Sequence, residues 1–323
     1  MTKRLLSALL GAAAFASLSA APAAALNART WVSGTGVDQA GCGPIASPCR
    51  TLQYAHDATN AGGEIDVKDP AGYGSLFIHK AINIVADGVG VAGVLAPSGG
   101  NGITVNVGAT ENVVLRGLTI EGAGIGANGI VFANGGSLSV INCAVQGFAT
   151  SGNGNGILII NNTAKFDIAV INSTFSDNAS YGLRYSAQNN TSGRLTIDRS
   201  TAIRNNVGFS FETRATSANL YLAMSESNAA NNLLDGVQLY ANPFSVSAIF
   251  DHVLSNNNGS YVNNAGTGSG FVVTIPQAFA QLVAFTRCVA HNDYSYGLNG
   301  NIGSYGDNHF GTATGSITTL NAQ

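Results

Sequence analysis

The chain has 323 residues, of which only 10% are charged and 41 are glycine, and its formal net charge is −3. This composition is too apolar for a disordered chain and too rich in glycine and asparagine for a helical domain. The basic residues form no stripe that could neutralise phosphates, which argues against nucleic acid and anionic membrane surfaces as partners.

Residues 1–25 have the pattern of a secretory signal peptide. Lys3 and Arg4 form the basic n-region, an apolar h-region follows, and an Ala-Ala-Ala sequence places the cleavage site near Ala25. A membrane anchor is the alternative, but the apolar run is short, rich in alanine and followed by no stop-transfer charges. We therefore expect a secreted or periplasmic protein with no membrane span and a mature net charge of −5.

Residues 26–62 are expected to form an N-terminal disulfide loop and a capping helix. Cys42 and Cys49 lie close together in a loop, and in an exported chain they are expected to form a disulfide. Two free thiols are the alternative. A short amphipathic helix is predicted over residues 51–60, where it would cover the open end of a repeat domain. His56 on this helix is expected to be a solvated or capping residue.

Residues 63–323 are expected to form one repeat domain. A glycine followed by a short apolar strand recurs about every 27 residues, at Gly102, Gly129, Gly156, Gly182, Gly208, Gly236, Gly270 and Gly297. A repeat of this length predicts a solenoid. Each unit also contains a second stretch with period-two alternation, which is typical of half-buried strands. The predicted fold class is an all-β parallel β-helix with about 27 residues per coil.

The alternation in the second stretch slips by one residue at a corner. Val140 and Cys143, for example, are both expected to face inward although they are three residues apart. The inward column after this corner is predicted to be Cys143, Ser173, Ser200, Ser225, Val253 and Cys288. Because stacked strands are about 4.8 Å apart, Cys143 and Cys288 are too distant for a disulfide and are expected to be buried free thiols.

Asparagines recur at a second corner. Asn178, Asn205 and Asn258 occupy equivalent positions, and Asp293 ends the series. Asparagine tolerates the left-handed backbone of a tight turn, and stacked amides can hydrogen-bond from coil to coil. We expect a structural ladder here, and an asparagine array that binds a ligand is the alternative.

The sequence resembles the right-handed parallel β-helix superfamily, the pectin-lyase-like fold. The segment TLQYAHDATNAGGEIDVKDPAGYGSLFIHKAINIVADG is similar to the N-terminal part of that superfamily, and VINCAVQG and VINSTFSDN are similar to its repeating coil. The likeness covers roughly residues 50–310. More narrowly, the chain resembles secreted bacterial β-helix proteins of unassigned function that have a cysteine loop after the leader and end on a G-D-N segment, here Gly306-Asp307-Asn308.

The resemblance implies a search for the polysaccharide-degrading motifs of the superfamily. The N-T-D, D-D, G-H-G and R-I-K segments of polygalacturonase-like sequences and the Q-D-T segment of pectin-methylesterase-like sequences are absent. The W-I-D-H motif of calcium-dependent pectate lyases has a partial match in Ile249-Phe250-Asp251-His252, but their R-x-P-x-x-R motif is missing. Asp251 and His252 are therefore weak catalytic candidates, and a pair of ordinary corner residues is the alternative.

One patch on the strand after the repeat glycine has the composition of a sugar-binding surface. Arg184, Glu212, Gln238 and Tyr240 are assigned to the outward face, and Arg214 is expected nearby. Arginine and glutamine can hydrogen-bond sugar hydroxyls or carboxylates, and tyrosine offers a stacking face. An ordinary solvated sheet face is the alternative. His79, His291 and His309 have no spacing typical of zinc, so neither a metal nor another cofactor is expected.

Three functions are consistent with the sequence. The first is a secreted, non-catalytic β-helix that binds a polysaccharide or a cell-surface glycan. The second is a divergent polysaccharide lyase or hydrolase, which would need two or more carboxylates, or an aspartate with an arginine, in one outward cleft. The third is a structural or adhesive solenoid without a defined ligand.

Overall fold

The computed structural model describes residues 26–150, 152–160, 163, 165–187, 192–213, 219–241, 246–259, 268–275, 280–293, 296–300 and 302–320. The predicted signal peptide, residues 1–25, and Arg214 of the predicted patch lie outside these ranges. Within the described ranges, no helix is long and apolar enough to cross a membrane.

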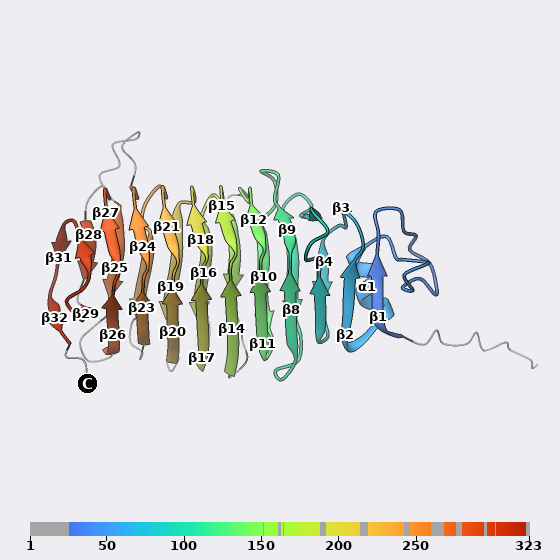
Figure 1. The fold of residues 1–323 in the computed structure, drawn as a ribbon, viewed down its shortest axis with the longest axis horizontal. Helices are drawn as coiled ribbons and strands as arrows, with labels where there is room; N and C mark the ends of the chain where they lie inside the picture. Colours follow the sequence, from blue (N-terminus) through green and yellow to red (C-terminus); the bar gives the residue numbers. More distant parts are fainter. Residues whose placement is uncertain are drawn as a thin grey trace, which may run out of the picture.

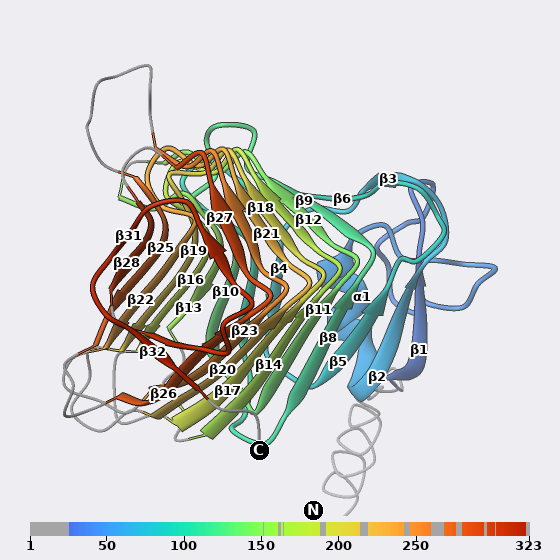
Figure 2. The same ribbon diagram turned by 60° about the vertical axis from the view of Figure 1, so that its left-hand side comes forward.

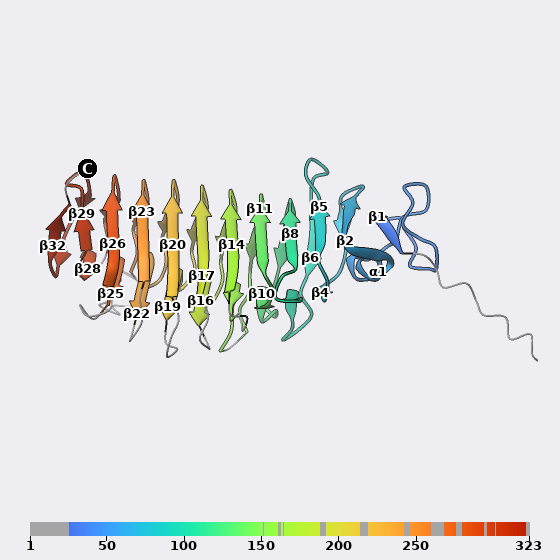
Figure 3. The ribbon, with the colours of Figure 1, turned by 90° about the horizontal axis from the view of Figure 1, so that it is seen from below.

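The described strands form three parallel sheets, which the chain visits in the order A, B, C in every coil (Figures 1 and 2). The twelve strands of sheet A are β1 (Asn27–Val32), β2 (Thr59–Val67), β5 (Ile82–Val85), β8 (Asn112–Arg116), β11 (Ser137–Ile141), β14 (Lys165–Ile171), β17 (Ser192–Asp198), β20 (Asn219–Ser225), β23 (Val246–Asp251), β26 (Ala280–Thr286), β29 (Ile302–Ser304) and β32 (Ile317–Thr319). Figure 3 shows these strands side by side along the length of the molecule.

Sheets B and C have ten strands each. Sheet B contains β3 (Ala71–Gly72), β6 (Ala92–Leu95), β9 (Leu118–Glu121), β12 (Ala144–Gln146), β15 (Thr174–Ser176), β18 (Thr201–Ile203), β21 (Asn228–Ala230), β24 (Leu254–Asn256), β27 (Val289–His291) and β30 (His309–Phe310). Sheet C contains β4 (Leu76–Ile78), β7 (Asn101–Asn106), β10 (Asn128–Asn134), β13 (Asn155–Ile159), β16 (Tyr181–Ala187), β19 (Val207–Thr213), β22 (Val237–Ala241), β25 (Ser269–Thr274), β28 (Tyr296–Gly300) and β31 (Ala313–Thr314). The predicted solenoid is confirmed.

The core consists of columns of equivalent inward side chains. On sheet C, Ile130 pairs with Ile157, which pairs with Leu183, and Phe209 and Val237 continue the column. All five side chains are buried. The apolar side chains of one coil are buried only when the two neighbouring coils cover them. The coils therefore stabilise one another.

The corner between sheets A and B confirms the predicted slip of one residue. A single residue with positive φ makes the corner in six successive coils, at Asn142, Asn172, Arg199, Glu226, His252 and Arg287. The buried residue after it continues the small column, in which the backbone N–H of Ser173 donates to Ser200 Oγ and that of Ser200 to Ser227 Oγ. The assignment of Ser225 to this column was wrong: Ser225 pairs with Asp198 on the outward side of sheet A, because the strand ends two residues later than the pattern indicated.

Cys143 and Cys288 are buried free thiols, as predicted. Desolvation raises the pKa of Cys143 to about 11 and that of Cys288 to about 12. Both thiols therefore stay protonated at neutral pH, which makes them poor nucleophiles.

The asparagine column lies at the corner between sheets B and C. Each amide Nδ2 donates to the next Oδ1, from Asn178 to Asn205 (2.9 Å), Asn232 (3.3 Å), Asn258 (2.9 Å) and finally Asp293 (3.0 Å). The predicted ladder is confirmed and includes Asn232 as an additional member. The backbone explanation was wrong, because the positive φ belongs to the preceding residue and the buried amides bridge the coils instead.

The N-terminal cap contains the disulfide between Cys42 and Cys49 and the helix α1 (Leu52–Ala58). The helix begins after Thr51, whose hydroxyl oxygen accepts from the backbone N–H of Tyr54, and it ends where Thr59 adopts an extended conformation. His56 was expected to be a solvated or capping residue; it is fully buried, so the solvated alternative was wrong. Desolvation lowers the pKa of its imidazole.

Candidate functional site

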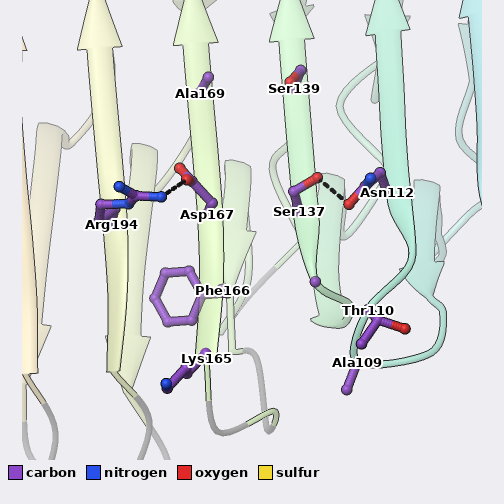
Figure 4. A pocket seen from close by; sticks show the side chains of 11 residues that line it. Ala109, Thr110, Asn112, Ser137, Ser139, Lys165, Phe166, Asp167, Ala169 and Arg194 are labelled. Atoms are coloured by element: carbon purple, nitrogen blue, oxygen red, sulfur yellow. Dashed lines mark hydrogen bonds and ion pairs between the residues drawn. The ribbon is translucent and has the colours of Figure 1, made fainter.

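A groove of about 580 Å³ lies on the outward face of sheet A, across β8, β11, β14 and β17. We call it the sheet groove. It is lined by Ala109, Thr110, Asn112, Gly136, Ser137, Ser139, Lys165, Phe166, Asp167, Ala169 and Arg194. Figure 4 shows that most of its polar side chains come from neighbouring strands, with Thr110 on the loop before β8.

The local sequence explains which side chains reach the groove. In β14, Phe166, Ile168 and Val170 alternate with outward residues, and these three are buried in the core. The intervening Lys165, Asp167 and Ala169 therefore face outward, as period-two alternation requires. The same alternation in β17 leaves Arg194 exposed between the buried Gly193 and Leu195.

One row of polar side chains crosses the groove at the same height in successive coils. The strand register aligns Asn112, Ser137, Asp167, Arg194 and Tyr221. Ser137 Oγ donates to Asn112 Oδ1 at 2.8 Å, and Arg194 Nη2 donates to Asp167 Oδ2 at 2.6 Å (Figure 4). The row extends beyond the groove to Tyr221, whose side chain is exposed.

The floor of the groove is made of small side chains. Ser139 pairs with Ala169, and Thr196 and Ala223 continue this column through the next two coils. The lining extends to both sides of the polar row, from Gly136 and Lys165 at the start of the strands to Ser139 and Ala169. It includes residues of four successive coils, so the groove crosses the strands along the solenoid axis.

The groove has one carboxylate and two cationic side chains. Asp167 is already paired with Arg194, and both side chains are substantially exposed, at 48% and 71%. Glycoside hydrolysis by the usual route needs two opposed carboxyl groups, and calcium needs several oxygen ligands. The lining residues supply neither set. Lys165 and Arg194 can instead donate hydrogen bonds to the carboxylates or hydroxyls of a sugar chain.

The predicted patch lies on sheet C, where Arg184, Glu212, Gln238 and Tyr240 come from the adjacent strands β16, β19 and β22. Arg184 Nη2 pairs with Glu212 Oε2 at 3.1 Å, and the guanidinium group lies over the ring of Tyr181. Glu212 and Gln238 are buried, so the expectation of an open outward patch was wrong for these two side chains. A role of these residues in ligand binding stays a prediction.

The sequence contained a signal for this burial. The outward positions of sheet C include Val131 and Val272, which are buried although they point away from the core. Strands that are buried on both faces have near-continuous apolar runs, and NGIVF and SGFVV are such runs. The alternation argument assigns a side chain to one face of the sheet, and it does not predict how much of that side chain is exposed.

Asp251 and His252 lie at the A–B corner, on a ridge of charged side chains. His252 Nδ1 is 3.2 Å from Asp251 Oδ1 and 3.4 Å from Glu226 Oε1. Arg287 donates to both carboxylate oxygens of Asp251. The sequence showed no acidic neighbour of Asp251, but the stacking of coils places Glu226 close to the same imidazole. Their catalytic role stays a prediction.

A comparison with solved structures identifies the fold. Over 91% of this chain and 78% of the other, the structure is similar to that of the pectate lyase Pel9A, with a TM-score of 0.53 and 18% sequence identity. The chain has the pectin-lyase-like parallel β-helix fold. A rhamnogalacturonan lyase matches with a TM-score of 0.38 and 13% identity over 80% of this chain and 87% of that one. No protein-family model and no curated protein matches the sequence.

The sequence analysis did not predict the sheet groove. Its residues are outward positions in the stretch with period-two alternation, so Lys165, Asp167 and Arg194 could have been found by aligning that stretch between coils. The groove itself depends on the register of Ser139 and Ala169, which the sequence alone did not fix.

Proposed function

We propose that this protein is a secreted, non-catalytic β-helix that binds an acidic polysaccharide along the sheet groove. The observation that carries the proposal is the polar row on sheet A, in which Arg194 and the exposed Tyr221 occupy adjacent coils. Arginine supplies paired donors for a carboxylate, and tyrosine supplies a flat face for a sugar ring.

The spacing of the row suits a linear polymer. Adjacent strands are about 4.8 Å apart, which is close to the length of one sugar unit in an extended chain. A polysaccharide that lies along the axis would therefore present one unit to each coil. The groove over Ser139 and Ala169 gives such a chain room to approach the sheet.

The charges favour an acidic ligand over a neutral one. Lys165 and Arg194 outnumber the single carboxylate of Asp167 among the lining residues, so the groove is locally positive although the chain as a whole is acidic. The groove does contain an aspartate with an arginine, the pair that a divergent lyase could use, but Asp167 and Arg194 are bonded to each other. The lining offers no second carboxylate for an acid–base pair, so we favour binding over catalysis. The fold similarity to a pectate lyase is compatible with a uronate ligand.

Co-sedimentation of the mature protein with insoluble polygalacturonate and with a neutral glucan tests the proposal. We expect retention on the acidic polymer, weaker retention at high salt, and a loss of roughly tenfold or more in affinity for Arg194→Ala and Lys165→Ala, since a hydrogen bond to a charged group contributes about 1.5–3 kcal/mol. Arg204→Ala is the matched control. Arg204 also pairs with an aspartate one coil away, Asp177, but at the B–C corner.

Three outcomes would contradict this proposal. Release of unsaturated uronates or new reducing ends would show a lyase or hydrolase, especially if Asp251→Asn abolished it. Absence of retention on any glycan would favour the structural or adhesive solenoid. An equal loss of binding in Arg194→Ala and Arg204→Ala would show that the interaction does not use the groove.

A further inference from the structure

The two ends of the solenoid differ in whether their strand edges are covered. The described sheets end on β1, β3 and β4 at the N-terminal end and on β32, β30 and β31 at the C-terminal end. An end strand has one row of backbone N–H and C=O groups that no neighbouring strand binds. These groups either find other partners within the molecule or stay open to a further strand.

The disulfide loop covers the edge of sheet A at the N-terminal end. The backbone N–H of Trp31 in β1 donates to Gly43 O at 2.7 Å, and Trp31 O accepts from Cys49 N at 2.9 Å. Ser33, directly after β1, donates in turn to Cys49 O at 2.9 Å. The loop therefore binds β1 where a further strand would bind.

The segment around the start of α1 covers the edges of sheets B and C at the same end. Arg50 Nη1 donates to Gly72 O in β3 at 2.7 Å. Gln53 Nε2 donates to Phe77 O in β4 at 3.4 Å, and Gln53 Oε1 accepts from Phe77 N at 2.8 Å. A strand of another molecule would have to displace these bonds, so the N-terminal end is closed to strand pairing.

The C-terminal end has no such cover in the described part of the chain. Ile302 N in β29 donates to Ser316 O, and Ile302 pairs with Ile317 in β32. In this parallel register, Ile317 and Thr319 direct their backbone N–H and C=O groups away from β29, toward the open end. Figure 2 shows this end, with β31 and β32, turned forward, and the single described helix, α1, lies at the opposite end (Figure 1).

The open end also exposes apolar core positions. Ile317 continues an inward column of sheet A, yet it is 47% exposed, whereas its partner Ile302 is 5% exposed. Ala313 in β31 is exposed as well, although its partner Leu298 is buried. Phe310 in β30 packs against the core and is only half-buried. One more layer of β-structure would remove these side chains from water.

The sequence of this end lacks the residues that usually protect a strand edge. Natural edge strands often contain lysine or proline, which discourage pairing with another molecule. Residues 302–320 contain no lysine, arginine, glutamate or proline. Their one carboxylate, Asp307, accepts from Thr286 Oγ1 of the preceding coil at 2.7 Å, so it lies at the A–B corner. Two copies of this end can therefore meet without a pair of like charges between their strand edges.

We propose that two copies of this chain associate through their C-terminal ends. An open strand edge is complementary to another strand edge. The N-terminal end of a second copy does not supply one, because its cap already binds β1, β3 and β4. The C-terminal end of a second copy has the same open edge and the same apolar side chains. A two-fold axis relates two such ends, so the assembly closes at a dimer instead of growing into a filament.

The symmetry fixes how the strands meet. A two-fold axis normal to sheet A reverses the direction of its strands, so β32 of one copy lies antiparallel to β32 of the other. The same axis places β30 of each copy against β31 of its partner. The two A sheets then form one continuous sheet, and the dimer is nearly twice as long as one chain without being wider.

Sedimentation velocity over a wide range of protein concentration, together with small-angle X-ray scattering, tests the proposal on the chain without its predicted signal peptide. We expect a monomer–dimer equilibrium and a dimer of nearly twice the maximum dimension of the monomer. Ile317→Lys places a cation on both copies at the shared end, so it should weaken dimerisation by roughly tenfold or more. Val37→Lys is the matched control, because Val37 is also an exposed apolar residue, at 57%, but lies in the cap. It should leave the dimerisation constant unchanged.

Thr319→Pro is a second variant, which acts on the backbone. The N–H of Thr319 points to the open end, so proline removes a donor from the edge while the bonds to β29 remain. We expect weaker dimerisation with an unchanged circular dichroism spectrum. A protein that is monomeric at every concentration, a compact side-by-side dimer, or a filament would overturn the proposal. So would a dimer that neither Ile317→Lys nor Thr319→Pro weakens.

Discussion

Two arginine–carboxylate pairs on the outside of this β-helix differ in what surrounds them. Arg184 pairs with Glu212 on sheet C, and Arg194 pairs with Asp167 on sheet A, in each case between adjacent coils. The side chain of Glu212 is 4% exposed and that of Asp167 is 48% exposed. The two pairs have the same chemical groups and both join adjacent coils. One pair is buried as part of the fold, and the other is accessible to a ligand.

The difference in exposure sets what each pair can do. A buried ion pair gains electrostatic strength but has lost the hydration of both groups, so removal of one partner leaves an unpaired charge in a poor solvent. An exposed pair is screened by water and adds little to stability. Only the exposed pair can exchange its internal partner for a carboxylate of a ligand at small expense.

The largest expected effect is that of Glu212→Ala. It leaves the partly buried guanidinium group of Arg184 without its carboxylate, and we expect a destabilisation of about 2–4 kcal/mol. Asp167→Ala on sheet A should change stability by less than about 1 kcal/mol. Urea unfolding followed by circular dichroism measures both. Equal effects in the two variants would mean that burial does not distinguish the pairs.

The next effect is expected for Gly193→Ala, which tests whether the core beneath the groove supports the groove itself. A Cβ at Gly193 would lie 2.1 Å from the ring of Phe166, its neighbour in β14. The ring has to move, and such overpacking typically destabilises by about 1–3 kcal/mol. Because Phe166 and Gly193 directly precede Asp167 and Arg194, glycan binding should weaken as well.

Thr196→Ala is the control for Gly193→Ala. Thr196 belongs to the same strand, β17, but its side chain is exposed, so we expect neither a comparable loss of stability nor a displaced ring. A Gly193→Ala protein with unchanged melting temperature would show that the inward packing of Phe166 tolerates the added methyl group.

Asp293→Asn is expected to have a smaller and pH-dependent effect. Desolvation raises the pKa of Asp293 to about 6, while the unfolded chain keeps the ordinary value of 3.8. The native state therefore holds the proton more tightly, and stability falls as the pH rises from about 4 through 6. Asparagine does not titrate and completes the amide ladder from Asn258, so the variant should gain about 1–2 kcal/mol above pH 6.

The pH dependence of thermal unfolding separates this prediction from a general change in packing. The gain in Asp293→Asn should shrink below pH 4, where the carboxyl group of the native protein is neutral in both states. Asp177→Asn should show the opposite sign, because the hydrogen bond from Arg204 lowers the pKa of Asp177. A gain that is independent of pH would contradict the argument from ionisation.

The sequence predicted the fold well because the fold repeats. Each coil repeats the same alternation, so the inward columns, such as the one that contains Ile130 and Ile157, follow directly from the pattern. The error at Ser225 arose where the strand continues for two residues beyond the pattern. The column to which a residue belongs depends on the local alternation of apolar and polar residues, and a repeating sequence shows that alternation in every coil.

The candidate sites were harder to predict because they depend on what is not repeated. Exposure of Glu212 depends on what covers sheet C, and proximity of His56 to His79 depends on how the cap meets the first coil. Neither the exposure of Glu212 nor the distance between the two histidines follows from a repeating sequence pattern. The histidines were judged by their spacing in the chain, whereas the structure joins them through two separate elements.

The smallest change in stability, and the sharpest test of the comparison, is expected for Asp167→Asn. It removes the charge that competes for Arg194 while keeping a side chain of the same size, so the melting temperature should stay within about 1 °C of the unmodified protein. The freed guanidinium group should then bind polygalacturonate several-fold more tightly in co-sedimentation at low salt. Glu212→Gln supplies the matched change in the buried pair, where stability should fall without any gain in binding. If Asp167→Asn instead weakened binding, the carboxylate would itself contact the sugar, and Arg194 would serve to position it.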